Sequence, residues 1–268
     1  MKVLLLSYFH NEPIMYVLER YSKRRGIHVD IMRVNPATCK DSILKESFDL
    51  ALVPSSLVEQ ACSMGYKITD VVIACRDSLR SVRVFYTRSV PVDKLRDIYS
   101  TRESIVSRRL LVSLLRMHGL VDLTVKCIEV SLQNMDLILS TKPTLLIGDL
   151  ALVASSRYRT VIDLCELWLS LYKVPLVFAV LLARTTCDSK RSEIIEDVVE
   201  TLRRELVQGN LNVDDVLSWS QHWIKRHVNR DVLRNYLSNE IIYVMKKEEV
   251  AASLSLIKQA LAQAPPLD

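Results

Sequence analysis

The sequence has 268 residues, of which 49% are hydrophobic and 25% are charged, and its formal net charge at pH 7 is +5. These values are typical of a globular protein with a large core, arranged as one large or two modest domains. The basic residues are dispersed rather than clustered, which argues against a nucleic-acid-binding surface and still permits a small anionic ligand.

Two apolar stretches are too short for a membrane or export segment. Residues 174–183 are uninterruptedly apolar, but a helix that spans a bilayer needs about 20 such residues. Residues 1–6 are too short for a secretory signal and carry no cleavage site. We therefore predict a cytoplasmic protein that binds neither membranes nor nucleic acid.

The cysteines suggest neither a metal site nor a redox motif. They form no CxxC pair and no Cys/His cluster, so buried free thiols are the favoured interpretation. GxSxG, P-loop and GxGxxG motifs do not occur either, and we predict no cofactor. The 6 cysteines are Cys39, Cys62, Cys75, Cys127, Cys165 and Cys187.

The first part of the chain alternates predicted strands and helices. This order is typical of a parallel α/β layer whose strand carboxyl ends face a ligand. Further strands are expected at residues 68–74 and 81–87. The alternating elements are strands at residues 3–6, 27–34 and 48–53 and helices at residues 14–25, 40–46 and 57–64.

A linker at Val90-Pro91 is predicted to lead into a second lobe. There we expect an amphipathic helix from Ser100 to Met117, a strand at residues 120–129 and a short helix at residues 130–139. The helix begins with the hydroxyl-rich sequence STRES, and hydroxyls beside free amides at a helix start form an anion site.

Residues 143–183 are the segment around which the rest of the predicted fold is arranged. An apolar strand at residues 144–147 stops at Gly148, where a residue without Cβ allows an unusual turn or a close approach of the backbone to a ligand. After a brief strand at residues 161–162, Asp163 is placed to cap a helix. The apolar run at residues 174–183 predicts a buried central strand that returns to the first lobe.

Residues 188–264 are expected to be helical throughout. Trp219 and Trp223 lie four residues apart and are interpreted as core packing, as is Trp168. The lobes are then residues 1–89, residues 90–174, and a return of residues 175–268 to the first lobe. The predicted helices of the last segment are residues 194–206, 213–228, 230–237 and 238–262, with Pro265-Pro266 ending the last.

Hydrogen-bonding groups gather where predicted strands end and helices begin. They are mostly hydroxyls and amides, which suits a site that holds a polar or anionic small molecule, or an enzyme whose substrate supplies its own base. Asp149 is equally placed to cap a helix, and Arg76, Arg80 and Arg83 either meet a dianion or are solvated. The candidate site residues are Ser7, His10, Asn11, Ser55, Ser56, Ser81, Thr101, Ser104, Gly148 and Asp149.

Several segments in order over roughly residues 1–183 resemble the menaquinone biosynthesis dehydratases of the futalosine route. The resemblance implies a type II periplasmic-binding-protein-like fold, with two α/β lobes joined by two crossovers and the ligand between them. A sister enzyme of the same fold, dihydroxynaphthoate synthase, would carry a catalytic His where this chain has Ile147-Gly148-Asp149. The segments are DLALVPSS (49–56), SVRVF (81–85), STRES (100–104), LLIGDLAL (145–152) and IDLCELW…VPLVFAV (162–180).

The resemblance further implies a hydro-lyase that converts chorismate into 3-[(1-carboxyvinyl)oxy]benzoate. In that reaction the enolpyruvyl carboxylate of the substrate can take the ring proton, while the protein fixes the conformer and stabilises developing charge. The family's functional Ser maps onto Ser81. The family's functional Asn falls on His10, with Asn11 one position later.

That mismatch leaves three alternatives: Asn11 takes the role, His10 donates instead, or the chemistry differs. Asp77 and Tyr172-Lys173 also depart from the family pattern, and Lys173 could pair with a carboxylate. We therefore keep two further functions open on the same scaffold. One is a non-catalytic binding protein for a small carboxylate, and the other is an enzyme acting on a different menaquinone-pathway intermediate. The sequence leaves a homodimer open.

Overall fold

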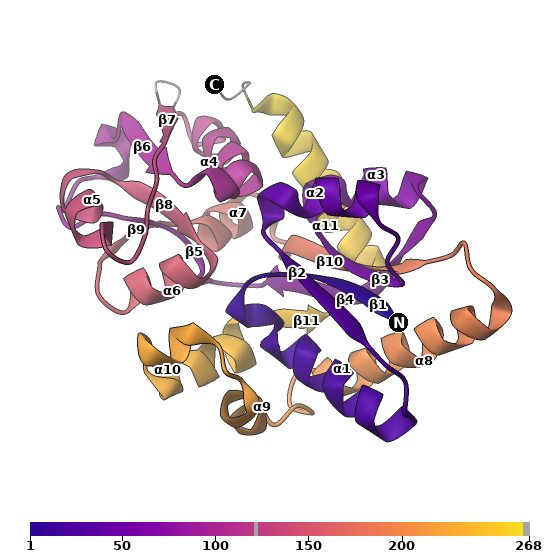
Figure 1. Cartoon of the computed structure of the whole chain (residues 1–268). Coiled ribbons are helices and arrows are strands. Elements are labelled where there is room, and N and C mark those ends of the chain that lie inside the picture. Colours follow the sequence, from indigo (N-terminus) through magenta and orange to yellow (C-terminus); the bar gives the residue numbers. More distant parts are fainter. Residues whose placement is uncertain (121–122, 265–268) are drawn as a thin grey trace.

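The computed structural model describes residues 1–120 and 123–264, which form two sheets with helices packed on their faces (Figure 1). The first sheet has the order β11-β4-β10-β3-β1-β2, with bounds Ile242–Val244, Tyr66–Cys75, Leu176–Arg184, Leu50–Pro54, Lys2–Leu6 and Asp30–Val34. The second has the order β7-β6-β8-β5-β9, with bounds Thr124–Cys127, Asp97–Ser100, Thr144–Ile147, Val82–Phe85 and Thr160–Asp163.

The α-helices precede, follow or connect these strands. They are α1 (Glu12–Arg25), α2 (Pro36–Lys45), α3 (Val58–Ser63), α4 (Ile105–Met117), α5 (Met135–Thr141), α6 (Gly148–Ser155), α7 (Leu164–Tyr172), α8 (Ser189–Leu206), α9 (Val213–Trp219), α10 (Arg230–Asn235) and α11 (Lys247–Gln263). None of the helices in the described residues is both long enough and apolar enough to cross a bilayer.

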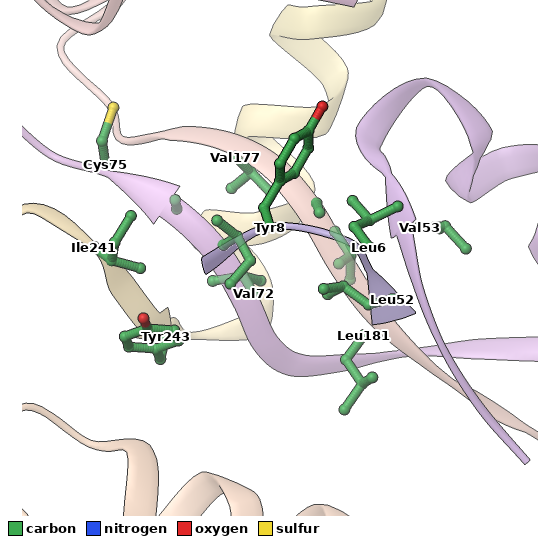
Figure 2. Close-up of a cluster of buried hydrophobic side chains, with 14 of the residues drawn as sticks. Leu6, Tyr8, Leu52, Val53, Val72, Cys75, Val177, Leu181, Ile241 and Tyr243 are labelled. Carbon is green, nitrogen blue, oxygen red and sulfur yellow. The ribbon is translucent and has the colours of Figure 1, made fainter. Parts of the chain in front are cut away.

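The predicted parallel layer is present at the start of the chain, where β1 pairs in parallel with β2 and with β3. The long apolar run forms β10, which lies inside the first sheet but runs antiparallel to both β3 and β4. Figure 2 shows the core that this arrangement creates, with Leu6, Leu52, Val72 and Leu181 contributed by four strands. All four side chains are at most 4% exposed.

The chain enters the second sheet earlier than we predicted. β5 pairs with β8 and β9, so the passage between the sheets lies at residues 76–81 and not at Val90-Pro91. Asp163 caps α7 as predicted, accepting the amides of Cys165 and Glu166. The same carboxylate also accepts hydrogen bonds from the Leu79 amide and from Nε of Arg83, which tie the passage to the second lobe.

Two expected elements of the second lobe differ in the structure. A strand, β6, occupies residues 97–100, and the helix predicted from Ser100 starts as the single turn η4 (Arg102–Ser104) before α4. A four-residue strand has too few positions for its alternation to stand out. The strand predicted at residues 120–129 is observed at residues 124–127, and residues 121–122 lie outside the described residues.

The C-terminal segment is not helical throughout. The sequence IYV at residues 242–244 forms β11 at the edge of the first sheet, because its β-branched and aromatic residues favour a strand over the predicted helix. Trp168 is fully buried, as expected. Trp223 is 38% exposed, so the interpretation of the Trp pair as core packing is wrong for this residue.

The prediction that all cysteines are free is also wrong. Cys75 at the end of β4 and Cys165 in α7 form a disulfide, with their Cα atoms 6.6 Å apart. The residues are 90 positions apart in the sequence, so spacing alone could not have paired them. Folding brings them together, because Cys75 lies where the chain leaves the first lobe and Cys165 lies shortly before the chain returns to it.

The disulfide predicts how many cysteines react with an alkylating reagent. Denatured protein kept free of reductant should react with an alkylating reagent at 4 cysteines, whereas reduced protein should react at all 6, as measured by mass spectrometry. Cys75→Ser should lower the free energy of unfolding by about 2–4 kcal/mol relative to the oxidised protein. Alkylation at every cysteine without reductant would show that the bond does not form in solution.

Candidate functional site

A cavity of about 250 Å³ lies between the two sheets, where strands of the first lobe end and helices of the second begin. Its walls are largely apolar, and a few polar groups converge on it, which is the usual composition of a small-molecule site. From the first lobe it is lined by Leu6, Tyr8, His10, Pro36, Ala37, Lys40, Pro54, Ser56, Leu57, Ile73, Leu79, Ser81, Phe178 and Ala179. From the second lobe it is lined by Val82, Glu103, Ser104, Ile105, Val106, Ser107, Ile147 and Gly148.

His10 lines the cavity from the single turn η1 (Phe9–Asn11) that follows β1. Its Nε2 is buried without a partner among the described residues, and its Nδ1 lies 3.4 Å from the Tyr236 hydroxyl. The Tyr243 hydroxyl donates to the main-chain oxygen of His10 at 2.9 Å. Burial and the nearby His222 lower the pKa of His10 to about 3, so the ring is neutral at physiological pH.

Ser81 lies where the chain enters the second sheet, and it is 2% exposed. Its main-chain oxygen accepts the Gly148 amide at 2.7 Å, which anchors the start of α6 against the passage between the lobes. Its side chain interacts with Tyr236: burial raises the pKa of that tyrosine well above the ordinary value, and a hydrogen bond with Ser81 opposes the rise. Ser81 and His10 therefore share a neighbour as well as a cavity.

The start of α4 supplies the second-lobe wall. Ser104 to Ser107 line the cavity, and the first amides of a helix have no partner within the helix. Thr101 does not line the cavity, but its Oγ1 lies 2.7 Å from Oγ of Ser104 and orients that hydroxyl. Of the sequence STRES, Glu103 and Ser104 therefore line the cavity, and Thr101 does not.

Gly148 adopts the left-handed conformation, with φ +60°, at the start of α6. A Cβ added there would lie 2.4 Å from Cδ1 and Cε1 of the Tyr8 ring. The close approach that we predicted at this glycine is therefore made by a side chain of the other lobe. The Tyr8 hydroxyl lies 3.3 Å from Oε2 of Glu103, so this ring contacts the second lobe twice.

Asp149 is buried and does not line the cavity. Its Oδ1 accepts the Phe9 amide at 2.9 Å, and its Oδ2 lies 3.4 Å from Nε2 of His222. Burial raises the pKa of Asp149 to about 7, although the hydrogen bond from Phe9 opposes the rise. Burial lowers the pKa of His222 to about 4. Asp149 of the second lobe therefore bonds Phe9 of the first lobe, and neither Asp149 nor His222 lines the cavity.

This raised pKa makes stability depend on pH. Between about pH 4 and 7 the folded protein keeps a proton on Asp149 that the unfolded chain has lost, so this carboxyl lowers stability as the pH rises through that window. Asp149→Asn keeps an acceptor for the Phe9 amide and does not titrate. Relative to wild type, the free energy of unfolding of the variant should rise by at most about 1.4 kcal/mol for each unit of increasing pH over that range.

Denaturant titrations of both proteins at pH 5 and pH 8 measure this difference. The histidines His10 and His222 titrate in both proteins and largely cancel in the comparison. A gap between the two proteins that stays constant with pH would contradict a raised pKa at Asp149.

Five of the ten candidate residues line the cavity: His10, Ser56, Ser81, Ser104 and Gly148. Asn11 is fully buried outside the lining, and its Nδ2 donates to the Leu6 oxygen. Ser55 donates to the Val177 oxygen, and Ser7 and the remaining candidates also lie outside the lining. The roles of the lining residues stay predictions.

Two of the three arginines at the passage between the lobes are paired with carboxylates. Arg80 pairs with Glu240 and Arg83 pairs with Asp163, each at 2.8 Å, and Arg76 does not line the cavity. Lys173 ends α7 outside the lining. Among the described residues that line the cavity, the cation is instead Lys40, an exposed residue of α2.

Sequence reasoning missed Tyr8, Lys40, Glu103, Tyr236 and His222. Tyr8 stands between two candidates in the sequence, so its position was a usable signal. Tyr236 and His222 come from the C-terminal segment, where no motif pointed to a site. Among the described residues, no group of three or more His, Cys, Asp or Glu side chains has metal-binding geometry.

Solved structures similar to this chain share one fold class. Protein AF1704 from Archaeoglobus fulgidus has a TM-score of 0.71 and 13% identity, covering 97% of this chain and 96% of its own. The Candida albicans CA3427 gene product, described as having the generic periplasmic binding protein fold, has a TM-score of 0.67 and 10% identity, covering 100% and 92%. The alkanesulfonate-binding protein SsuA from Xanthomonas axonopodis pv. citri, bound to MOPS, has a TM-score of 0.65 and 14% identity, covering 99% and 94%.

At these identities the likeness shows the fold, and the chain has the two-lobe periplasmic-binding-protein-like fold that the sequence motifs implied. The model of the menaquinone biosynthesis family matches residues 1–262. This chain therefore belongs to the menaquinone biosynthesis family. The match includes the C-terminal segment, which carries Tyr236 and His222. No curated protein matches the sequence.

Proposed function

We propose that this protein is a chorismate-dehydratase-like hydro-lyase, which removes water from chorismate to form 3-[(1-carboxyvinyl)oxy]benzoate. The observation that carries the proposal is the shared cavity, where His10, Ser81 and the start of α4 line one largely apolar space. Family membership supports the pathway. Elimination creates an aromatic ring, so much of the driving force resides in the substrate.

The cavity suits a small anionic acid with an apolar ring. A volume of about 250 Å³ holds one small molecule rather than a peptide. Ile73, Leu79 and Phe178 provide apolar contact for a ring. Ser104 and the start of α4 line the cavity, which supports a carboxylate-binding role for this helix start, and the lining contains one cation, Lys40, as well as the acidic Glu103.

His10 is the better candidate for the position that the family gives to Asn. Nε2 of His10 and Oδ1 of Asn11 are both buried without a partner among the described residues, but only His10 lines the cavity, and Nδ2 of Asn11 donates to the Leu6 oxygen. A neutral imidazole can donate or accept one hydrogen bond there, as an amide can. Ser81 supplies a hydroxyl to the same space.

A second candidate is a non-catalytic binding protein for a small anion. The observation that favours it is the similarity to SsuA, an alkanesulfonate-binding protein whose structure contains MOPS. A third is an enzyme of the same pathway that acts on another carboxylate. The hydro-lyase and the binding protein differ in one measurable respect: only the hydro-lyase converts its ligand into a product.

The test is incubation of the purified protein with chorismate, followed by chromatography and mass spectrometry for an aromatic product lighter by one water. Turnover that is absent from heat-denatured protein is the expected result. Calorimetric binding of chorismate or MOPS without turnover would establish the binding protein instead. Neither binding nor turnover would direct the search to other carboxylates of the pathway.

A further inference from the structure

A free cysteine, Cys127, lies at the carboxyl end of β7 and lines a second cavity, of about 460 Å³. β6 and β7 are parallel, and the residues that follow both strands line this cavity, together with Leu150 of α6. Open α/β sheets bind ligands at such strand ends. The cavity shares the lining residue Glu103 with the ligand cavity described above.

Arg108, in the first turn of α4, brings a buried cation to this cysteine. The residue is 6% exposed, and its Nη1 donates to Sγ of Cys127. Among the described residues its Nε has no partner and no carboxylate pairs with its guanidinium. A buried charge without an opposite charge is costly, and a neutral sulfur is only a weak acceptor. The contact therefore favours the thiolate of Cys127, for which the hydrogen bond is charge-assisted.

We propose that Cys127 is a modification site, which forms a mixed disulfide with a small zwitterionic peptide disulfide while Arg108 stabilises its thiolate. The thiolate is the nucleophilic form of a cysteine, and a neighbouring arginine is one of the features that mark reactive cysteines. This inference goes beyond the proposed hydro-lyase activity and does not depend on it.

The exchange balances without a further oxidant. Cys127 loses its thiol proton to solvent, and the thiolate attacks one sulfur of the incoming disulfide. One sulfur–sulfur bond forms between Cys127 and that sulfur, while the sulfur–sulfur bond of the incoming molecule breaks. The second sulfur leaves with the electron pair and takes up a proton from solvent. Cys127 is thereby oxidised, and the released half of the molecule is reduced to a thiol.

The walls around Cys127 carry charges of both signs. Arg102 provides a guanidinium, and Glu103 and Glu129 provide carboxylates. A zwitterionic peptide disulfide has carboxylates that can pair with the guanidinium and ammonium groups that can pair with the carboxylates. Oxidised glutathione has this chemistry and is therefore the probe for the site.

The other free cysteines provide internal comparisons in the same protein. Cys39 is buried, and burial raises its pKa to about 12. Burial also raises the pKa of Cys62. Cys187 is partly exposed and is the closest match in accessibility. The contact with Arg108 therefore predicts that Cys127 reacts first.

The test is incubation of the native protein with oxidised glutathione at neutral pH, without reductant, followed by proteolysis and mass spectrometry. Cys127 should gain a glutathionyl group in place of its thiol hydrogen, at a rate about 10-fold or more above that of Cys187. The same experiment with the uncharged bis(2-hydroxyethyl) disulfide should give a smaller ratio between the two cysteines. An equal ratio with both disulfides would overturn recognition by the charged walls.

Arg108→Met removes the guanidinium and keeps an unbranched side chain, and it should slow the reaction at Cys127 about 10-fold. Arg109→Met is the matched control, because its guanidinium donates to the Leu261 oxygen from the adjacent position of α4. It should leave the rate at Cys127 unchanged. An unaltered rate in Arg108→Met would refute the role of the arginine. Should that variant not fold, the wild-type rates still decide the proposal, which fails if Cys127 reacts no faster than Cys187.

Discussion

Gly148→Ala should be the most destabilising single-methyl addition at this site. The residue has φ +60°, where a Cβ costs about 1–2 kcal/mol, and that Cβ would lie 2.4 Å from the Tyr8 ring. Ring displacement in a packed wall adds about 1–3 kcal/mol. The free energy of unfolding should therefore fall by about 2–5 kcal/mol in denaturant titrations, and the cavity should lose the wall that Tyr8 forms.

Gly26→Ala is the control for backbone strain alone. Gly26 has φ +64°, and a Cβ added there would meet nothing within 4 Å. The difference between the two variants then measures the contact with Tyr8. Combining Gly148→Ala with Tyr8→Ala should recover part of the loss, because the overlap disappears with the ring. Equal losses for Gly148→Ala and Gly26→Ala would refute close packing of Tyr8 on Gly148.

Ser81→Ala should reduce turnover of chorismate by roughly 10²–10³ with little change in stability. Ser81 lines the cavity and is the residue onto which the family's functional Ser maps. Its main-chain bond to Gly148 survives the substitution, so the wall of the cavity should persist. The measurement is kcat and KM from the rate of aromatic product formation.

Ser113→Ala provides a matched control in α4, because Ser113 and Ser81 are each 2% exposed and Ser113 does not line the cavity. Its turnover should equal that of wild type. An unchanged rate in Ser81→Ala would remove this hydroxyl from the reaction, while binding of chorismate by the variant would show that the cavity is intact.

The sequence alone predicted the elements whose signal lies in neighbouring residues. The apolar runs of β1, β3 and β10 are bounded by polar residues or proline, and Asp163 precedes a helical pattern directly, so these elements were predictable. Strand pairing is not local: nothing in residues 82–85 indicates that β5 belongs to the second sheet. The disulfide between Cys75 and Cys165 could not be predicted for the same reason.

The candidate site was likewise predictable only in part. Strand ends bring His10, Ser81 and Gly148 into one cavity, and the order of elements anticipated that meeting. Which polar groups face the ligand depends on local hydrogen bonds, and Asn11 and Ser55 are used by the backbone. Tyr236 lies 226 positions from His10, so only folding could reveal their contact.

The bond between Cys75 and Cys165 also restricts how the two lobes can move relative to each other. It joins the last residue of β4 to α7 beside the passage between the lobes, and so holds one point of each lobe at a nearly constant separation. A rotation of one lobe about this point keeps that separation, whereas sliding of one lobe past the other changes it. In the oxidised protein we therefore expect any motion that widens the cavity to be mainly a rotation.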